Sequence, residues 1–498
     1  MSLNERKHLK IIIIGAVLLI GVFSASFIFA QQKSQKENKV TSFQYMKTLN
    51  SVFDFVEQNY VDEVDARVLY EGALKGMLDA LGDPYTLYLD ADYMRDLQDT
   101  TVGSFGGVGL SISKPTESTP EKPAYVEVAS PIEDSPGAKA GIQAGDYIVA
   151  IEDRPTPEMT MSEVLGALRG EIGTPVTVTI LRGKNMRFDV KLVRARIEVP
   201  TAKYGMISGT TIGYVRLIEF TRETPKRFQE AVDSFQKNGY TGMIIDLRDN
   251  PGGLIDSVVN VADKFIDKGV IVSTRSRLAS ENQVYSAGKD KTTIKNSVPV
   301  VVLINKGSAS ASEILSGFLK DYKLAYLVGE RTYGKGSVQQ VIPLSETDGI
   351  KITMARYYTP SDVNIDKIGI PPDKEVVNIQ PFTKEQEESY VKMINSGLIE
   401  KAVEANPNMT EAQIEAKAKD IAAEFGIEER LVRRVIRNQV LRTQGSQLYD
   451  LDFDLQLKAA LEVLNSGNYK TLVRRTKTLK QLQEEVDAKE KKDKKDQK

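Results

Sequence analysis

The stretch GSASASEIL, residues 307–315, places three serines in alternation with small residues, directly before a helix-like apolar pattern. A serine hydroxyl acts as a nucleophile when a neighbouring base takes its proton, and that base is usually a histidine. The 498 residues contain a single histidine, His8, and no cysteine. A Cys nucleophile, a disulfide framework and a zinc site built from Cys or His are therefore excluded, and a reactive serine needs another base.

Ser310 and Glu313 in this stretch have the spacing of a capping box. In that motif a serine begins a helix, and a glutamate three residues later accepts from the backbone N–H of the serine. A serine at a helix start also has free backbone N–H groups and the positive end of the helix dipole beside it, which suit an oxyanion. Capping and catalysis are thus compatible interpretations, although capping is favoured on local evidence alone.

The segment GERTYGKGSVQQVIPL, residues 329–344, offers a base in Lys335. A buried lysine is disfavoured as an ammonium ion, so its pKa falls, and the neutral amine is a competent general base. Gln339 lies four positions further along and shares a face with Lys335 if the segment is a strand, so it could orient the amine. An exposed turn lysine and a surface glutamine are the plain alternatives.

The same segment has most of a phosphate-binding P-loop. Gly329, Gly334 and Lys335 have the required spacing, but Gly336 occupies the position of the Ser or Thr that ligates Mg²⁺. The following VQQVIPL predicts a strand, whereas a P-loop leads into a helix. Nucleotide binding is therefore a minor alternative.

Two glycine-rich turns could present backbone N–H groups to an anion. IIDLRDNPGGLIDS, residues 244–257, predicts a strand that ends in a tight turn before a helix, which suits an oxyanion. SFGGVGLSIS, residues 104–113, predicts a glycine loop that leads into a strand. Such a loop could hold the terminal carboxylate of a peptide while the strand edge pairs with the peptide. A plain turn and a flexible hairpin are the respective alternatives.

The surrounding patterns predict the elements that position these groups. After a polar stretch, residues 42–95 have helical apolar spacing, and residues 96–195 alternate short β-prone runs with Gly and Pro. Residues 196–385 alternate strand-like and helix-like runs, which predicts an α/β core with partly parallel strands. Residues 386–498 are helical in pattern and highly charged, and the closing KEKKDKKDQK predicts a disordered tail.

The N-terminus contains an uncharged apolar run, residues 11–30, that is long enough to cross a bilayer as a helix. Basic residues precede the run, so residues 1–10 are expected in the cytoplasm and the rest of the chain outside it. A cleaved signal peptide is the alternative, with Ser24-Ala25-Ser26 as the cleavage site. Both interpretations predict an exported protein.

The overall composition is that of an ordinary globular protein. Hydrophobic residues make up 41% and charged residues 27%, and the formal net charge is −2. The composition therefore has no signature of a nucleic-acid partner, and the length suggests about three domains.

The motifs together resemble those of a known family. FGGVGL with SPGAKAGIQAGDYIVAI is similar to a PDZ domain, and DLRDNPGG, NKGSASASEIL and GERTYGKGSVQ resemble the carboxyl-terminal processing, or tail-specific, serine proteases. The resemblance extends from about Tyr45, through LGDPYTLYL, to RYYTPSD and GIPPD near residue 373. It departs from the family pattern at SDVNIDKIGIPPD, and the residues from 386 onward carry no assigned motif.

This resemblance implies a role for each motif. Ser310 would be the nucleophile, Lys335 the general base and Gln339 its orienting partner. The backbone N–H groups of Gly253 and Ala311 would form the oxyanion hole. The PDZ loop would bind the C-terminus of the substrate through Gly106, Gly107, Val108, Gly109 and Leu110. The family also implies cleavage of exported proteins near a C-terminus, often by a homodimer, and no metal or organic cofactor.

The sequence therefore predicts a membrane-tethered, extracytoplasmic serine endopeptidase with a Ser–Lys dyad. The predicted fold is an α/β protease core with an inserted β-rich PDZ domain, helical N-terminal and C-terminal regions and one transmembrane helix. The alternative function is a non-catalytic PDZ scaffold that binds exposed C-termini, which has no use for the SASAS, GKG and NPGG motifs. The predicted segments are 1–10 (tail), 11–30 (anchor), 31–95 (helical), 96–195 (PDZ), 196–385 (protease core) and 386–498 (C-terminal region).

Overall fold

The computed structural model describes residues 41–496, apart from short gaps at 116–118, 120–122, 133–134, 144, 184 and 442–446. The chain divides into two compact units, with the boundary after Gly82. The predicted membrane anchor, residues 11–30, lies outside the described residues. Within the part of the chain that is described, no helix is both long and apolar enough to cross a membrane.

The first unit contains two helices, α2 (Ser42–Asn59) and α3 (Ala66–Asp79). Thr41 begins α2, where its N–H donates to the side chain of Gln44 at 3.0 Å. The Asp65 carboxylate begins α3 by accepting from the N–H of Arg67 at 2.8 Å. The helical N-terminal region that the apolar spacing predicts is therefore present.

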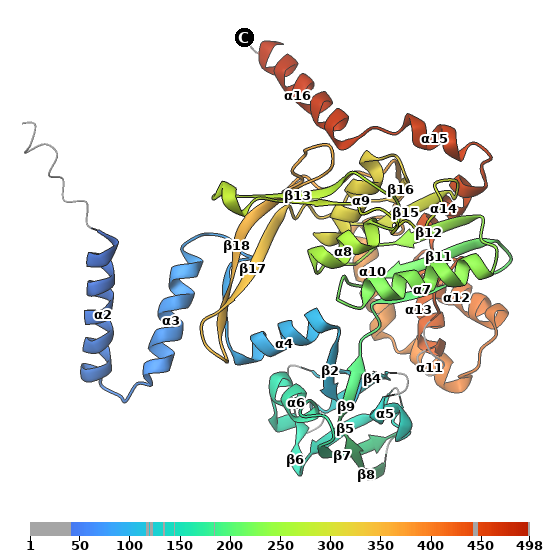
Figure 1. The fold of residues 1–498 in the computed structure, drawn as a ribbon. Coiled ribbons are helices and arrows are strands. Elements are labelled where there is room, and N and C mark those ends of the chain that lie inside the picture. Colours follow the sequence, from blue (N-terminus) through green and yellow to red (C-terminus); the bar gives the residue numbers. More distant parts are fainter. Residues whose placement is uncertain are drawn as a thin grey trace, which may run out of the picture. The chain divides into compact units, whose positions relative to one another are not determined.

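The second unit is built on a six-stranded sheet, four of whose strands are labelled β11, β12, β15 and β16 in Figure 1. All pairs in it are parallel except the first, which is antiparallel. Every residue of the strand GMIID, residues 242–246, is buried, as expected for a sheet that is covered on both faces. In spatial order the strands are β10 (Ala202–Met206), β11 (Ile212–Leu217), β12 (Gly242–Asp246), β15 (Val300–Ile304), β16 (Tyr326–Gly329) and β19 (Lys374–Glu375).

Helices cover both faces of this sheet, and strand alternation determines which residues each helix meets. In β12, Met243 and Ile245 join one apolar cluster, and Ile244 between them joins another. The first cluster includes side chains of α7 (Thr224–Lys237), α8 (Ile255–Ala262) and α9 (Ala311–Asp321). The second includes side chains of α14 (Leu455–Asn465) and α15 (Tyr469–Arg475). The predicted α/β core is confirmed.

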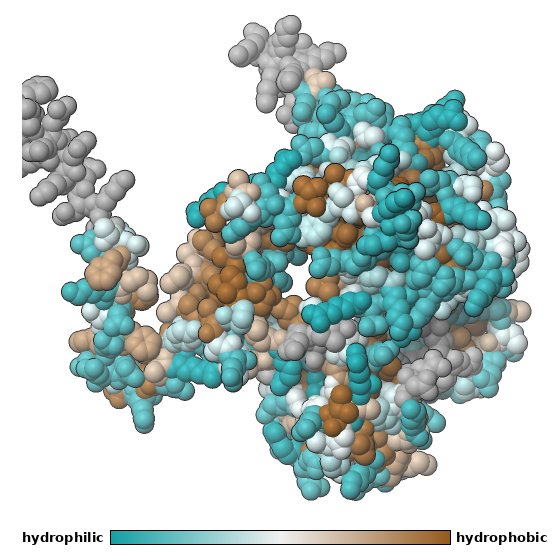
Figure 2. Space-filling view, in the orientation of Figure 1, coloured by the Kyte–Doolittle hydropathy of each residue, from teal (hydrophilic) through white to brown (hydrophobic). Residues whose placement is uncertain are grey.

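A second, antiparallel sheet projects beside the core. Its strand β17 pairs with β18 alone among the described strands, so one edge of β17 is unpaired. Figure 2 shows apolar side chains gathered over these two strands, and Val341 and Ile342 of β17 are each more than a third exposed. The sheet comprises β1 (Leu87–Leu89), β13 (Val270–Ser276), β14 (Gln283–Ser286), β17 (Ser337–Pro343) and β18 (Gly349–Tyr358), with a 3₁₀ turn at Ala279–Glu281.

The β-rich region forms a small domain with its own apolar core. The chain enters and leaves it through one antiparallel ribbon, in which Ser104 of β2 pairs with Glu198 of β9. It is thus an insertion, preceded by α4 (Ala91–Val102). Its elements are β2 (Ser104–Gly107), β3 (Leu110–Ser113), β4 (Val126–Pro131), α5 (Pro136–Lys139), β5 (Tyr147–Ile151), β6 (Arg154–Pro155), η1 (Thr156–Glu158), α6 (Met161–Leu168), β7 (Pro175–Arg182), β8 (Met186–Val193) and β9 (Ala195–Glu198).

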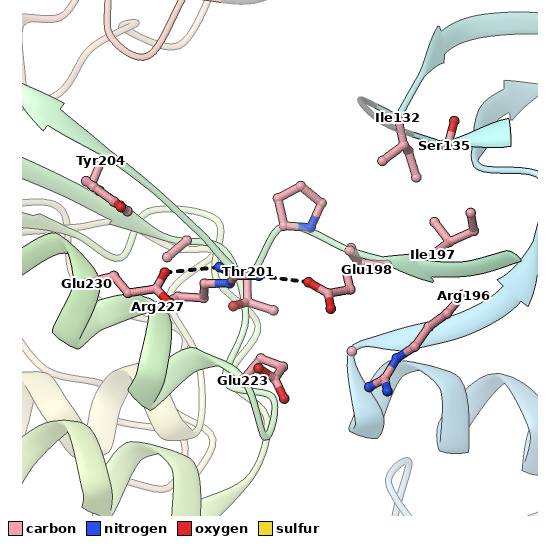
Figure 3. Close-up of a pocket in the computed structure, with 14 residues that line it drawn as sticks. Ile132, Ser135, Arg196, Ile197, Glu198, Thr201, Tyr204, Glu223, Arg227 and Glu230 are labelled. Atoms are coloured by element: carbon pink, nitrogen blue, oxygen red, sulfur yellow. Dashed lines mark hydrogen bonds and ion pairs between the residues drawn. The ribbon is translucent and has the colours of Figure 1, made fainter. Parts of the chain in front are cut away.

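A cavity of about 530 Å³ lies where β9 returns to the core. Figure 3 shows Arg227 of α7 between two carboxylates, 2.7 Å from Glu198 and 3.0 Å from Glu230. These groups are solvent-accessible, and exposed ion pairs contribute at most about 1 kcal/mol each. Neither Ser310 nor Lys335 lines this cavity.

The C-terminal region is helical, as its pattern predicts. α10 (Lys384–Asn395), α11 (Leu398–Ala405), α12 (Glu411–Phe425) and α13 (Glu429–Leu441) share one apolar cluster. Asp454, at the start of α14, forms an ion pair with Arg248, and their charged atoms lie 2.6 Å apart. Arg248 follows the end of β12, so this pair connects α14 to the core. The last helix, α16 (Leu479–Asp496), extends into the tail that the sequence predicts to be disordered. Lys, Glu, Gln and Ala make up much of this helix, and these residues favour helix formation.

Candidate active site

Four of the predicted site residues line one cavity of about 730 Å³: Ser310, Lys335, Gln339 and Gly253. They come from the start of α9, the loop before β17, β17 itself and the turn after β12. Figure 2 shows the molecule hollowed beside the apolar face of β17. The structure therefore brings together three motifs that are far apart in the sequence.

Ser310 sits at the N-terminus of α9 with φ +54° and ψ −113°. This backbone conformation is strained for any residue other than glycine, and such strain is concentrated at functional sites. The turn after β12 packs tightly against it, because a Cβ added at Gly252 would lie 2.7 Å from the Cβ of Ser310. The Ser310 carbonyl accepts from the buried Tyr357 hydroxyl at 3.3 Å. These contacts hold a half-buried serine in one orientation at the cavity wall.

Glu313 connects the serine helix to the lysine loop. The buried carboxylate accepts from the N–H groups of Ser310 and Lys335 through one oxygen, at 2.9 Å in each case. Its other oxygen accepts from the Gly334 N–H at 2.7 Å and the Thr332 hydroxyl at 2.6 Å. Burial raises the pKa of Glu313, although all four hydrogen bonds act in the opposite direction. The contact with Ser310 is the one that the capping spacing predicts, and the contacts with the lysine loop are additional.

Lys335 has the environment of a lysine that gives up its proton readily. Desolvation lowers the pKa of its amine, and the nearby charge of Lys351 lowers it further. The carboxylates of Glu313 and Asp83 partly oppose this shift in pKa. The Lys335 ammonium lies 4.8 Å from the centre of the Tyr85 ring, in cation–π geometry. Tyr85 belongs to the LGDPYTLYL motif, and its contact with the lysine could not be inferred from local sequence.

Gln339 lines the same cavity as Lys335, but its side-chain hydrogen bonds are to residues other than Lys335. Its amide nitrogen donates to the hydroxyls of Ser337 at 2.9 Å and Thr353 at 3.1 Å. Among the described residues, no hydrogen bond joins Gln339 to Lys335. The orienting role of Gln339 therefore stays a prediction.

The NPGG turn is fixed against the loop after β11. The carbonyl of Phe220 accepts from the N–H of Leu254 at 2.7 Å, and the N–H of Phe220 donates to the carbonyl of Gly252 at 2.7 Å. Gly253 has φ +133°, and a Cβ there would lie 2.2 Å from the Phe220 carbonyl oxygen. Within the described residues, the N–H groups of Gly253 and Ala311 have no acceptor. Gly253 lines the cavity, whereas Ala311 is buried directly behind Ser310 and does not line it.

Asn250 is a positioning residue that sequence reasoning missed. Its carbonyl accepts from the Ala309 N–H at 3.0 Å and from the Ser312 hydroxyl at 3.0 Å. Its side-chain oxygen accepts from the Gly252 N–H at 2.9 Å. Asn250 thus connects the NPGG turn to the residues before and after Ser310. The sequence DNPGG by itself predicts only a turn.

The predicted peptide loop lies in the inserted domain. Gly106 and Gly107 pair with β9, and Leu110 begins β3, which is the edge strand of its sheet. Between these strands, the N–H groups of Val108 and Gly109 have no acceptor in the part of the chain that the structure describes. Free N–H groups beside a strand edge are what capture of a peptide C-terminus requires.

Comparison with known proteins gives the family. Residues 211–376 match peptidase family S41, residues 127–182 a PDZ domain, and residues 22–93 the N-terminal domain of the activating protease CtpB. A carboxy-terminal-processing protease of Bartonella bacilliformis is 41% identical over 368 residues, which cover 73% of this chain and 82% of that protein. The carboxy-terminal processing protease CtpA of Bacillus subtilis is 31% identical over 370 residues, or 74% and 77% of the two chains.

Among solved structures, a photosystem II D1 C-terminal processing protease aligns with 68% of this chain and 94% of its own, with 32% identity and a TM-score of 0.40. The family models and relatives define a serine-type peptidase that carries a PDZ domain. The chain belongs to the carboxyl-terminal processing proteases of peptidase family S41. The resemblance seen in the sequence is thereby confirmed.

Proposed function

We propose that this protease cleaves exported proteins near their C-termini with a dyad of Ser310 and Lys335. One observation carries the proposal: a strained serine and a desolvated lysine line the same cavity, and their backbone N–H groups bind the same oxygen of Glu313. A lysine with a lowered pKa replaces the histidine that the catalytic region lacks.

In the proposed reaction, the neutral Lys335 amine takes the Ser310 hydroxyl proton as the oxygen attacks the scissile carbonyl. The N–H groups of Gly253 and Ala311 donate to the oxyanion of the tetrahedral intermediate. The Lys335 ammonium then returns the proton to the leaving amine, which departs and leaves an acyl-enzyme. Water, deprotonated by the same amine, releases the second product and restores Ser310.

Gln339 is proposed to orient the amine during this cycle. The amide nitrogen donates to Ser337 and Thr353, which leaves the amide oxygen to accept a hydrogen bond. An ammonium group at Lys335 supplies such a donor after each proton transfer.

The PDZ domain is proposed to capture the substrate C-terminus. The N–H groups of Val108 and Gly109 would bind the terminal carboxylate, and the free edge of β3 would pair with the extended peptide. The proposal also includes a membrane anchor at residues 11–30, an extracytoplasmic catalytic region and a homodimer. No metal or organic cofactor takes part in the proposed cycle.

Peptides that differ only at their C-terminus test the proposed function. A peptide with a free terminal carboxylate is expected to be cleaved near that end, and its amidated form about tenfold more slowly, because the amide lacks the charged acceptor. The products are identified by mass spectrometry, and a fluorophosphonate probe is expected to label Ser310. A non-catalytic PDZ scaffold would instead bind the peptide with the free carboxylate, cleave neither peptide and leave Ser310 unlabelled.

The cleavage rate is expected to rise with pH. The neutral form of Lys335 is the active one, so kcat/KM should rise about tenfold per pH unit below the lysine pKa and become constant above it. The Lys351 charge disfavours the Lys335 ammonium, so Lys351→Met should raise the pKa of Lys335 and move the midpoint to higher pH. Full pH–rate profiles of the two proteins measure this, and an unchanged midpoint would contradict the assignment.

A further inference from the structure

The catalytic cavity contains a carboxylate that the proposed reaction does not use. Glu219 lies two residues after the end of β11 and lines the cavity together with Ser310 and Lys335. Among the described residues, no group donates a hydrogen bond to this carboxylate or forms an ion pair with it. It differs in this respect from Glu313, whose two oxygens are fully occupied by donors.

The backbone of Glu219 is held in place on both sides. Its carbonyl accepts from the Thr224 hydroxyl at 2.7 Å. The next residue, Phe220, forms a parallel bridge with Gly253, whose N–H is proposed to bind the oxyanion. Glu219 is therefore the residue next to this bridge, on the side of the proposed oxyanion hole.

The surroundings of Glu219 leave its charge uncompensated. Burial is the single cause that raises its pKa, and none of the cationic groups of the cavity offsets that shift. Those cations, Lys335, Lys351 and Arg222, line the same cavity at other positions. A half-buried carboxylate without a donor is unfavourable, and a donor from the substrate would relieve this.

The rest of the cavity wall is largely apolar. Leu97, Leu254, Ile314 and Val338 contribute to it, and Figure 2 shows the apolar face of β17 and β18 beside the hollow. A substrate side chain that crosses apolar surface and ends in a cation fits this arrangement. Lysine and arginine have such side chains, with an aliphatic stem and a charged head.

We infer that Glu219 is a specificity residue that binds a lysine or arginine side chain of the substrate next to the scissile bond. The inference rests on the proposed function, because it places the substrate in the same cavity. Asp256 also lines the cavity, but its side chain is exposed at the first turn of α8, where water solvates it. It therefore serves as the matched control.

A set of peptide pairs tests this inference. Each pair compares Lys with Gln, or Glu with Gln, at one of the three positions on either side of the cleaved bond. At one of these positions the wild-type protein is expected to favour Lys about tenfold in kcat/KM, as for a hydrogen bond to a charged group. Glu219→Gln should reduce the Lys/Gln ratio to about one, and Glu219→Lys should make Glu the favoured residue there. Asp256→Asn, with the same loss of charge, should retain the preference for Lys.

The affinities of the same peptides for Ser310→Ala protein, measured by fluorescence anisotropy, give a second result that does not require turnover. A Lys/Gln affinity ratio that disappears in the Ser310→Ala, Glu219→Gln double variant supports the inference. An equal ratio with and without Glu219, or no preference for Lys at any position, overturns it. If no peptide is cleaved by the wild-type protein, the proposed function fails, and the affinity ratio still decides the role of Glu219.

Discussion

Replacement of Ser310 or Lys335 by alanine is expected to lower kcat/KM at least about 10³-fold, while the affinity for a C-terminal peptide is retained. Removal of Ser310 eliminates the acyl-enzyme, and removal of Lys335 leaves the hydroxyl without a base. Because the two groups act as one unit, the double variant should lose no more activity than either single variant. The measurements are steady-state kinetics and peptide titration on the three variants.

The matched control is Lys306→Ala, an exposed lysine four residues before Ser310. This variant should retain the rate of the wild-type protein, because the Lys306 side chain is solvated and forms an ion pair with Glu330, away from the cavity of Ser310. A Lys335→Ala protein that kept more than about a tenth of the wild-type rate would remove Lys335 from the mechanism.

The second large effect is expected for Glu313→Gln. The carboxylate accepts four hydrogen bonds, and a glutamine at this position would turn an NH₂ group toward buried donors. Loss of hydrogen bonds to a buried charged acceptor lowers the free energy of unfolding by about 2–3 kcal/mol. The lysine loop would also lose its attachment to α9, so kcat should fall about 100-fold. Denaturant unfolding and steady-state kinetics measure the two losses separately.

The pH–rate profile distinguishes this role from a loss of folding alone. The Glu313 charge raises the pKa of Lys335, so its removal should lower that pKa and move the midpoint of the profile to lower pH. This shift is opposite to the one expected for Lys351→Met. Glu330→Gln, at the ion pair with Lys306, is the control and should leave the midpoint in place. A Glu313→Gln protein with the wild-type midpoint would show that Glu313 does not act on the lysine.

The sequence predicts well those features that depend on near neighbours in the chain. The Ser310–Glu313 spacing correctly predicts the hydrogen bond between these residues at the start of α9. The sequence after Lys335 correctly predicts a strand. The α/β alternation likewise predicts the core sheet. Each of these depends on residues that are close in sequence, where periodicity and capping are informative.

Contacts between distant segments could not be predicted in the same way. Glu313 meets the lysine loop about twenty residues downstream, and Tyr85 meets Lys335 from the other end of the catalytic region. The hydrogen bonds of Gln339 run to Ser337 and Thr353, although its spacing suggested Lys335. Such partners are fixed by how the two sheets pack, which periodicity does not encode.

The ion pair between Arg248 and Asp454 has a consequence for the order in which parts of the chain fold. Their side chains meet although 206 positions separate them, and α14 covers the face of β12 that contains Ile244. During translation this face stays uncovered until α14 has left the ribosome. Contacts of such long range form late and slowly. The protease core therefore closes only after residues as far along the chain as α14 have been synthesised.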